Sequence, residues 1–88
     1  MEKSTQPIIE EASSRKKILD IVTKKLELSA DEITDVSSFS EDLGADSLDT
    51  IEIIMDVEEK FQITISDLEG EKIRTFGDLV ALVDRLTN

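Results

Sequence analysis

The segment GADSLDTIEIIMDVEEKF, residues 44 to 61, predicts a helix that carries two separate apolar stripes. The helix is expected to begin with Asp46 or Ser47 at its N-cap position and to end at Lys60 or Phe61. At about 100° per residue, two groups of apolar side chains fall roughly 120 to 150° apart around its axis. The first stripe consists of Ile53, Ile54, Val57 and Phe61, and the second consists of Leu48, Ile51 and Met55.

One stripe is enough to reach a core, so the second stripe has two interpretations. It is buried if the helix packs on two sides within a bundle. Otherwise it stays partly exposed beside Glu52, Asp56 and Glu59, and the helix then presents an apolar strip with an acidic rim. Such a strip is typical of a transient interface with another protein.

Three further helices are expected around this one. Apolar residues at helical spacing predict a helix over residues 13 to 28. The S-x-x-E pattern of Ser66 and Glu69 predicts a short helix that ends near residue 73 or 74, and a last helix begins at Thr75 and continues to Leu86. We therefore expect an all-α fold, a small four-helix bundle with three longer helices and one short helix.

The first two helices are joined by a long loop, residues 29 to 46, that we expect to be ordered. Ser29 with Glu32, and Ser38 with Glu41, match the capping pattern of short helical turns, and Gly44 suits a left-handed backbone position. Ahead of the first helix, residues 1 to 12 are polar and are expected to form a flexible tail, which leaves residues 13 to 88 as one domain. The apolar residues expected to hold the loop against the core are Ile33, Phe39 and Leu43.

The charge of the chain is concentrated in one region. The net charge is −11, and the segment from Asp35 to Glu71 holds 12 acids and one base while the rest of the chain is balanced. This distribution argues against nucleic acid as a partner and favours basic protein surfaces. No apolar run is long enough to span a membrane, so we expect no membrane insertion and a cytoplasmic location.

The missing residue types exclude several kinds of site. Without cysteine or histidine the chain can form no disulfide, no zinc site and no imidazole base. A calcium-binding EF-hand that starts at Asp42 fails, because Ser47 stands where glycine is needed and Ile53 where a glutamate is needed. No catalytic constellation is visible, so we expect neither a metal site nor an enzyme.

Taken alone, Ser47 is most economically a helix N-cap. In context, the motif GADSLDT, residues 44 to 50, preceded by Glu41-Asp42-Leu43, resembles the modification motif of acyl carrier proteins, and the similarity extends from Arg15 to Leu86. The resemblance implies that a phosphopantetheinyl transferase attaches 4′-phosphopantetheine from coenzyme A to Ser47. It also implies a carrier of fatty acyl chains that works as a monomer with fatty acid synthesis enzymes and acyltransferases through their basic patches.

The resemblance further implies roles for two groups of residues. A phosphate on Ser47 would lie at a helix N-terminus, where backbone N–H groups favour an anion. The expected partner-binding residues are Asp46, Leu48, Asp49, Ile51, Glu52, Met55, Glu58 and Glu59. The candidates for lining an acyl-chain pocket are Ile53, Ile54, Val57, Phe61, Ile65, Ile73 and Leu79, which fit an ordinary core equally well.

Two alternatives stay open at this point. A specialised carrier for polyketide, lipid A or D-alanine transfer would share the same motif, and the acidic helix after D-S-L favours the fatty acid system. From another class, an acidic interaction module without a prosthetic group would use Ser47 only as a cap.

Gly70 departs from the alanine that is common in the family, which weakens the short helix and puts the chain-length preference in doubt.

Overall fold

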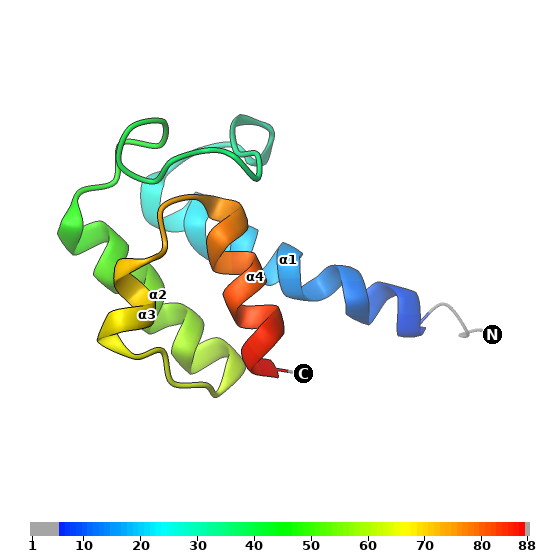
Figure 1. Cartoon of the computed structure of the whole chain (residues 1–88). Coiled ribbons are helices and arrows are strands. Elements are labelled where there is room, and N and C mark those ends of the chain that lie inside the picture. Colours follow the sequence, from blue (N-terminus) through cyan, green and yellow to red (C-terminus); the bar gives the residue numbers. More distant parts are fainter. Residues whose placement is uncertain (1–5, 88) are drawn as a thin grey trace.

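The computed structural model describes the backbone of residues 6–87 and the side chains of residues 14–87. Within these residues four α-helices follow one another, with one 3-10 turn, η1, in the first connection (Figure 1). The described residues form no strand, only an isolated bridge between Ser38 and Thr75. The expected all-α bundle of three longer helices and one short helix is thus confirmed. The elements are α1 (Gln6–Leu26), η1 (Ala30–Glu32), α2 (Ser47–Phe61), α3 (Asp67–Glu71) and α4 (Phe76–Thr87).

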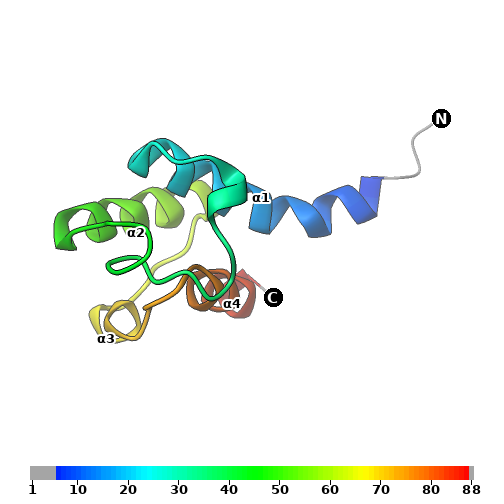
Figure 2. The ribbon, with the colours of Figure 1, turned by 90° about the horizontal axis from the view of Figure 1, so that it is seen from above.

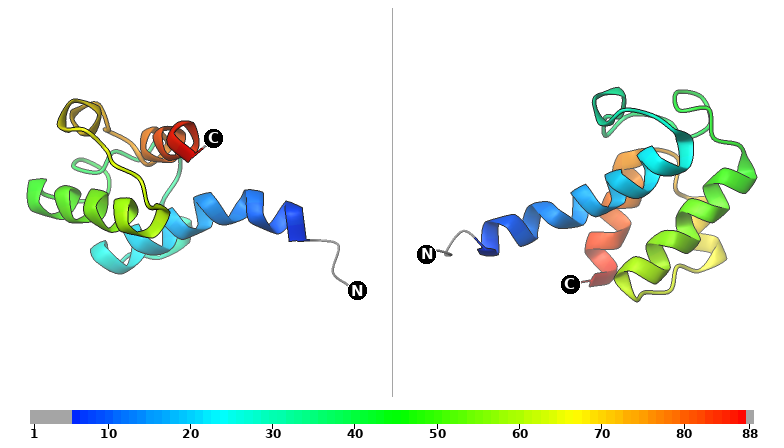
Figure 3. Two further views of the ribbon diagram at one scale, coloured as in Figure 1. Left: turned by 90° about the horizontal axis from the view of Figure 1, so that it is seen from below. Right: turned by 180° about the vertical axis from the view of Figure 1, so that it is seen from behind.

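Helix α1 differs at both ends from the expected range, residues 13 to 28. It begins at Gln6, so that Pro7 stands in the first turn, where its missing N–H costs no intrahelical hydrogen bond. It ends at Leu26 because Glu27 has a left-handed backbone, with φ of 57°. The expected flexible tail therefore overlaps the start of α1, and its residues 1–5 lie outside the described part of the chain. In Figures 1 and 3 the first turns of α1 project past the other helices.

The core lies where α1, α2 and α4 meet. The fully buried side chains come from these three helices, while α3 contributes none. Figure 2 shows α3 beside α4 and away from α1. Burial of this single cluster is the main force that holds the bundle together. Its largest fully buried members are Ile18, Val22, Ile53, Val57, Phe76, Leu79 and Val83.

The long loop between α1 and α2 is ordered by backbone hydrogen bonds to the start of α4. Phe39 N donates to Arg74 O at 2.9 Å, and Gly77 N donates to Asp35 O at 2.9 Å. Gly44 has the expected left-handed backbone, with φ of 72°. As expected, Ile33, Phe39 and Leu43 are buried and hold the loop against the core.

Reciprocal capping bonds start the two C-terminal helices. The Ser66 hydroxyl accepts from Glu69 N at 3.1 Å, as the S-x-x-E pattern predicts, but α3 ends at Glu71, two or three residues before the expected end. At the start of α4, the Asp78 carboxylate accepts from Thr75 N, and Asp78 N donates to the Thr75 hydroxyl, both at 3.1 Å. Local sequence therefore places both helix starts.

Candidate functional site

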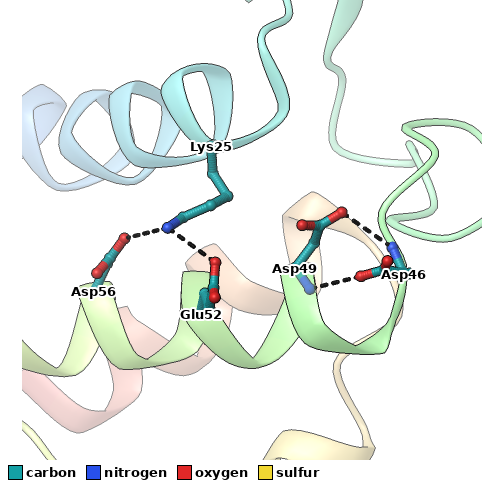
Figure 4. Close-up of polar contacts among 5 residues, drawn as sticks. All are labelled: Lys25, Asp46, Asp49, Glu52 and Asp56. Carbon is teal, nitrogen blue, oxygen red and sulfur yellow. Dashed lines mark hydrogen bonds and ion pairs between the residues drawn. The ribbon is translucent and has the colours of Figure 1, made fainter.

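Asp46, rather than Ser47, caps helix α2. The Asp46 Oδ1 atom accepts from Asp49 N at 2.8 Å, and the Asp49 Oδ2 atom accepts from Asp46 N at 3.3 Å (Figure 4). Ser47 is the first residue of the helix and is exposed. Among the described residues, its hydroxyl has no hydrogen-bond partner. Ser47 therefore does not act as the N-cap, which was its simplest interpretation from sequence. It lies at a helix N-terminus, a position that favours an anion.

The second apolar stripe of α2 is exposed. Leu48, Ile51 and Met55 have 62%, 53% and 59% of their surface accessible, whereas Ile53 and Val57 are buried. The interpretation in which α2 packs on two sides is therefore wrong, because only one of its stripes reaches the core. The exposed stripe starts directly beside Ser47 and follows the helix for two turns.

Two of the three acids beside this stripe, Glu52 and Asp56, already have a partner within the chain. Glu52 Oε1 lies 3.2 Å from Lys25 Nζ of helix α1, and Asp56 Oδ2 lies 3.5 Å from the same atom (Figure 4). The hydrogen bond to Glu52, with the negative charges of Glu52 and Asp56, raises the pKa of Lys25 in spite of its desolvation. Lys25 therefore remains protonated at neutral pH, and part of the acidic surface is neutralised by the protein itself.

Glu58 and Glu59, predicted together as partner contacts, have different surroundings. The Glu58 carboxylate accepts from Ile65 N at 2.7 Å and so ties the end of α2 to the segment before α3. Glu59 is exposed. Since Asp46 and Asp49 bond to each other, Glu59 is the predicted partner acid whose carboxylate has no hydrogen bond or ion pair among the described residues. The role of all these acids in binding partners stays a prediction.

A groove of about 580 Å³ runs between α2 and α3 and starts at Ser47. Two of the predicted pocket residues, Ile54 and Ile65, line it. Thr50, which sequence reasoning did not place there, also lines it. So does Gly70, where an added β-carbon would lie 3.6 Å from Ile54 Cδ1. The full lining is Ser47, Thr50, Ile51, Ile54, Met55, Glu58, Ile65, Ser66, Asp67, Gly70 and Glu71.

The other predicted pocket residues lie inside the bundle. Ile53, Val57 and Leu79 are buried in the core, and Ile73 is buried between α3 and α4 in the sequence. Phe61 is half-buried at the far end of α2, where Lys17 Nζ lies 6.0 Å from its ring centroid. These five side chains act as core in the described structure, and whether an acyl chain reaches them stays a prediction.

No group of three or more acids is arranged to hold a metal ion within residues 14–87. No described helix combines the length and the apolar character needed to cross a membrane.

Comparison with known proteins places these features in a family context. A family model described as "Phosphopantetheine attachment site" matches residues 16–83. An acyl carrier protein of Porphyromonas gingivalis is 44% identical over 70 residues, which cover 80% of this chain and 90% of the relative. An acyl carrier protein of Wolinella succinogenes is 48% identical over 67 residues, which cover 76% and 88%. The solved structure of an acyl carrier protein from Enterococcus faecalis is similar with a TM-score of 0.75 and 31% identity, covering 85% of this chain and 95% of that one.

Proposed function

Since the chain belongs to the acyl carrier protein family, whose members carry acyl groups on 4′-phosphopantetheine, we propose that Ser47 is the residue that bears this group. The observation that carries the proposal is the capping of α2 by Asp46, which leaves the Ser47 hydroxyl exposed and without a partner among the described residues. When bound, the group supplies the thiol that this cysteine-free chain lacks.

The surroundings of Ser47 fit the chemistry of attachment. The Ser47 oxygen forms a bond to the β-phosphorus of coenzyme A, the phosphoanhydride bond breaks, and adenosine 3′,5′-bisphosphate leaves. The chain offers no histidine to take the hydroxyl proton, so the transferase supplies the base. The resulting phosphodiester would carry one negative charge at the N-terminus of α2, where unpaired backbone N–H groups and the helix dipole would favour it.

We further propose that the exposed stripe of α2 is the docking surface for partner enzymes. Leu48, Ile51 and Met55 give an apolar centre, and Glu59 with the other α2 acids gives a rim that attracts basic residues. A small interface of this composition dissociates quickly and is weakened by salt, as a shuttle between enzymes requires. The phosphopantetheinyl transferase and the enzymes of fatty acid synthesis are the partners we propose.

The groove between α2 and α3 is proposed as the place where the acyl chain lies. It starts at Ser47 and is lined by apolar atoms of Ile54 and Ile65. An acyl chain attached near Ser47 and lying in this groove would therefore be removed from contact with water. Gly70 widens the groove at Ile54, since any larger residue would place atoms there. Fatty acyl chains are therefore the cargo that we favour over short polar groups such as D-alanine.

Fatty acid synthesis is consistent with the curated relatives, which are named acyl carrier proteins. Partner specificity distinguishes a fatty acid carrier from a specialised carrier. If this chain serves fatty acid synthesis, the enzymes of that pathway should elongate an acyl group loaded on it. We also propose a monomer, which size-exclusion chromatography with light scattering would test. The cytoplasmic location stays a prediction.

The first experiment measures intact mass after incubation with coenzyme A, Mg²⁺ and a phosphopantetheinyl transferase of broad specificity. We expect one phosphopantetheine increment on the wild type and none on Ser47→Ala. Ser40→Ala is the matched control, since Ser40 is an exposed serine of the preceding loop, and it should keep the increment. An increment that persists on a folded Ser47→Ala variant would overturn the assignment.

A further inference from the structure

We propose that Lys25 limits how strongly basic partners dock on α2, because it occupies Glu52 and Asp56 from the α1 side. This inference rests on the proposed function, since it concerns the same docking surface. Lys25 would act through the two carboxylates and would touch neither the partner nor Ser47. It is therefore a positioning residue, and it sets the charge that α2 offers to an arriving enzyme.

The geometry places one ammonium group between two acids on successive turns of α2. Lys25 Nζ lies 3.2 Å from Glu52 Oε1 and 3.5 Å from Asp56 Oδ2 (Figure 4). The Lys25 side chain is 28% exposed, while those of Glu52 and Asp56 are 43% and 47% exposed. Both acids thus still reach solvent, so a basic side chain of a partner can approach the carboxylates that Lys25 already holds.

The charge of α2 makes this competition significant. Between Ser47 and Phe61 the helix holds five acids and one base, so two of its five acids share the Lys25 charge. A partner arginine that binds Glu52 must either share the carboxylate with Lys25 or displace it. In both cases the attraction between the partner and Glu52 is weaker, because the electric field of a carboxylate paired with an ammonium group decreases faster with distance than the field of an unpaired carboxylate.

Lys24 offers a matched control on the same helix. It neighbours Lys25, is exposed, and takes part in no ion pair between described residues. Lys24→Gln and Lys25→Gln change the net charge of the chain by the same amount. Any difference between the two variants therefore reports the local contact with Glu52 and Asp56, and long-range attraction cancels.

The experiment measures the association rate constant of each apo variant with the phosphopantetheinyl transferase at several salt concentrations. At low salt we expect Lys25→Gln to associate roughly two- to fivefold faster than Lys24→Gln, since exposed ion pairs are worth a factor of this order. The difference should vanish at about 1 M salt, where charges are screened within about 3 Å. Lys25→Arg keeps the ion pairs and should match the wild type.

A steady-state readout separates this role from a merely structural one. Faster association lowers the KM for the carrier and leaves kcat unchanged, whereas a disturbed fold around Ser47 would lower kcat. Equal association rates for Lys25→Gln and Lys24→Gln would overturn the inference. If mass spectrometry also finds no loading of Ser47 in the wild type, the proposed function itself fails, so the two failures are distinguishable.

A second pair of variants covers the case in which Lys25→Gln loses its helical spectrum. Asp56→Asn leaves Glu52 as the one α2 acid bonded to Lys25 and should slow association with the transferase. Asp20→Asn removes the same charge from α1 and is its control. An Asp56→Asn variant that associates as fast as Asp20→Asn would contradict the competition.

Discussion

Gly77→Ala is expected to destabilise the protein by about 1 to 3 kcal/mol. Gly77 lies in the first turn of α4, where its N–H donates to Asp35 O at 2.9 Å. A β-carbon added there would lie 2.8 Å from Asp35 O and 3.2 Å from Asp35 Cβ, which is too close. The loop cannot simply retreat, because Phe76 N also bonds to Ser37 O at 3.0 Å.

The magnitude follows from three contributions. Overpacking against the Asp35 backbone costs about 1 to 3 kcal/mol. Loss or stretching of the hydrogen bond between Gly77 and Asp35 adds about 1 kcal/mol. The higher helix propensity of alanine stabilises the protein by up to about 1 kcal/mol, and by less in a first turn than in a helix interior. The unfavourable contributions therefore prevail.

Gly70→Ala is the matched control, since it makes the same change in another helix. Its β-carbon would lie 3.6 Å from Ile54 Cδ1, an ordinary contact, so we expect stabilisation by up to about 1 kcal/mol. Urea unfolding followed by far-UV circular dichroism measures both variants. Equal midpoints for Gly77→Ala and Gly70→Ala would refute the reasoning, because the close approach to Asp35 would then impose no strain.

Three other predictions concern the groove and the helix starts. Glu58→Ala should cost about 1 to 3 kcal/mol in urea unfolding, because it leaves Ile65 N–H without its acceptor. Gly70→Leu should fill the groove. A long acyl chain on the loaded variant should then no longer raise the thermal midpoint, while attachment of the prosthetic group persists. Asp78→Asn should lower the urea midpoint at pH 7, and this effect should shrink as the solution is made acidic. Hydrogen bonds from Arg74 N and Thr75 N hold the pKa of Asp78 below 3.8, so its stabilisation is complete above that value and is lost as the pH falls through the lower pKa of the folded state.

Sequence reasoning succeeded where the signal is local. The bond of the Ser66 hydroxyl to Glu69 N spans three residues, and so does the bond of the Thr75 hydroxyl to Asp78 N. A capping pattern of this kind acts before any tertiary contact forms, so it can be recognised in sequence. The periodicity of α2 likewise placed Ile53 and Ile51 on different stripes, and the structure shows that Ile53 is buried and Ile51 exposed.

The errors arise where tertiary geometry or a tolerated exception decides. The start of α1 was placed too late because the polar residues 1 to 12 were taken as a tail, although α1 begins at Gln6 and accommodates Pro7 in its first turn. The contact of Lys25 with Glu52 joins residues 27 apart, and only the crossing of α1 and α2 brings them together. Apolar spacing indicates which face of α2 is buried, but the opposing helix determines which of its acids are paired.

Helix α3 forms one side of the groove and can unfold locally with little cost in free energy. It has five residues, none of them buried, and its side-chain tie to α4 is the exposed pair of Glu69 and Arg85, 3.4 Å apart. Its unfolding would expose little apolar surface, so its amide hydrogens should exchange by local opening well before those of α2. If the groove beside Ile54 holds the acyl chain, as proposed, it can then adapt to chains of different length while the buried centre of the bundle stays closed. Cargo tolerance would in this way be a property of the least stable helix rather than of the core.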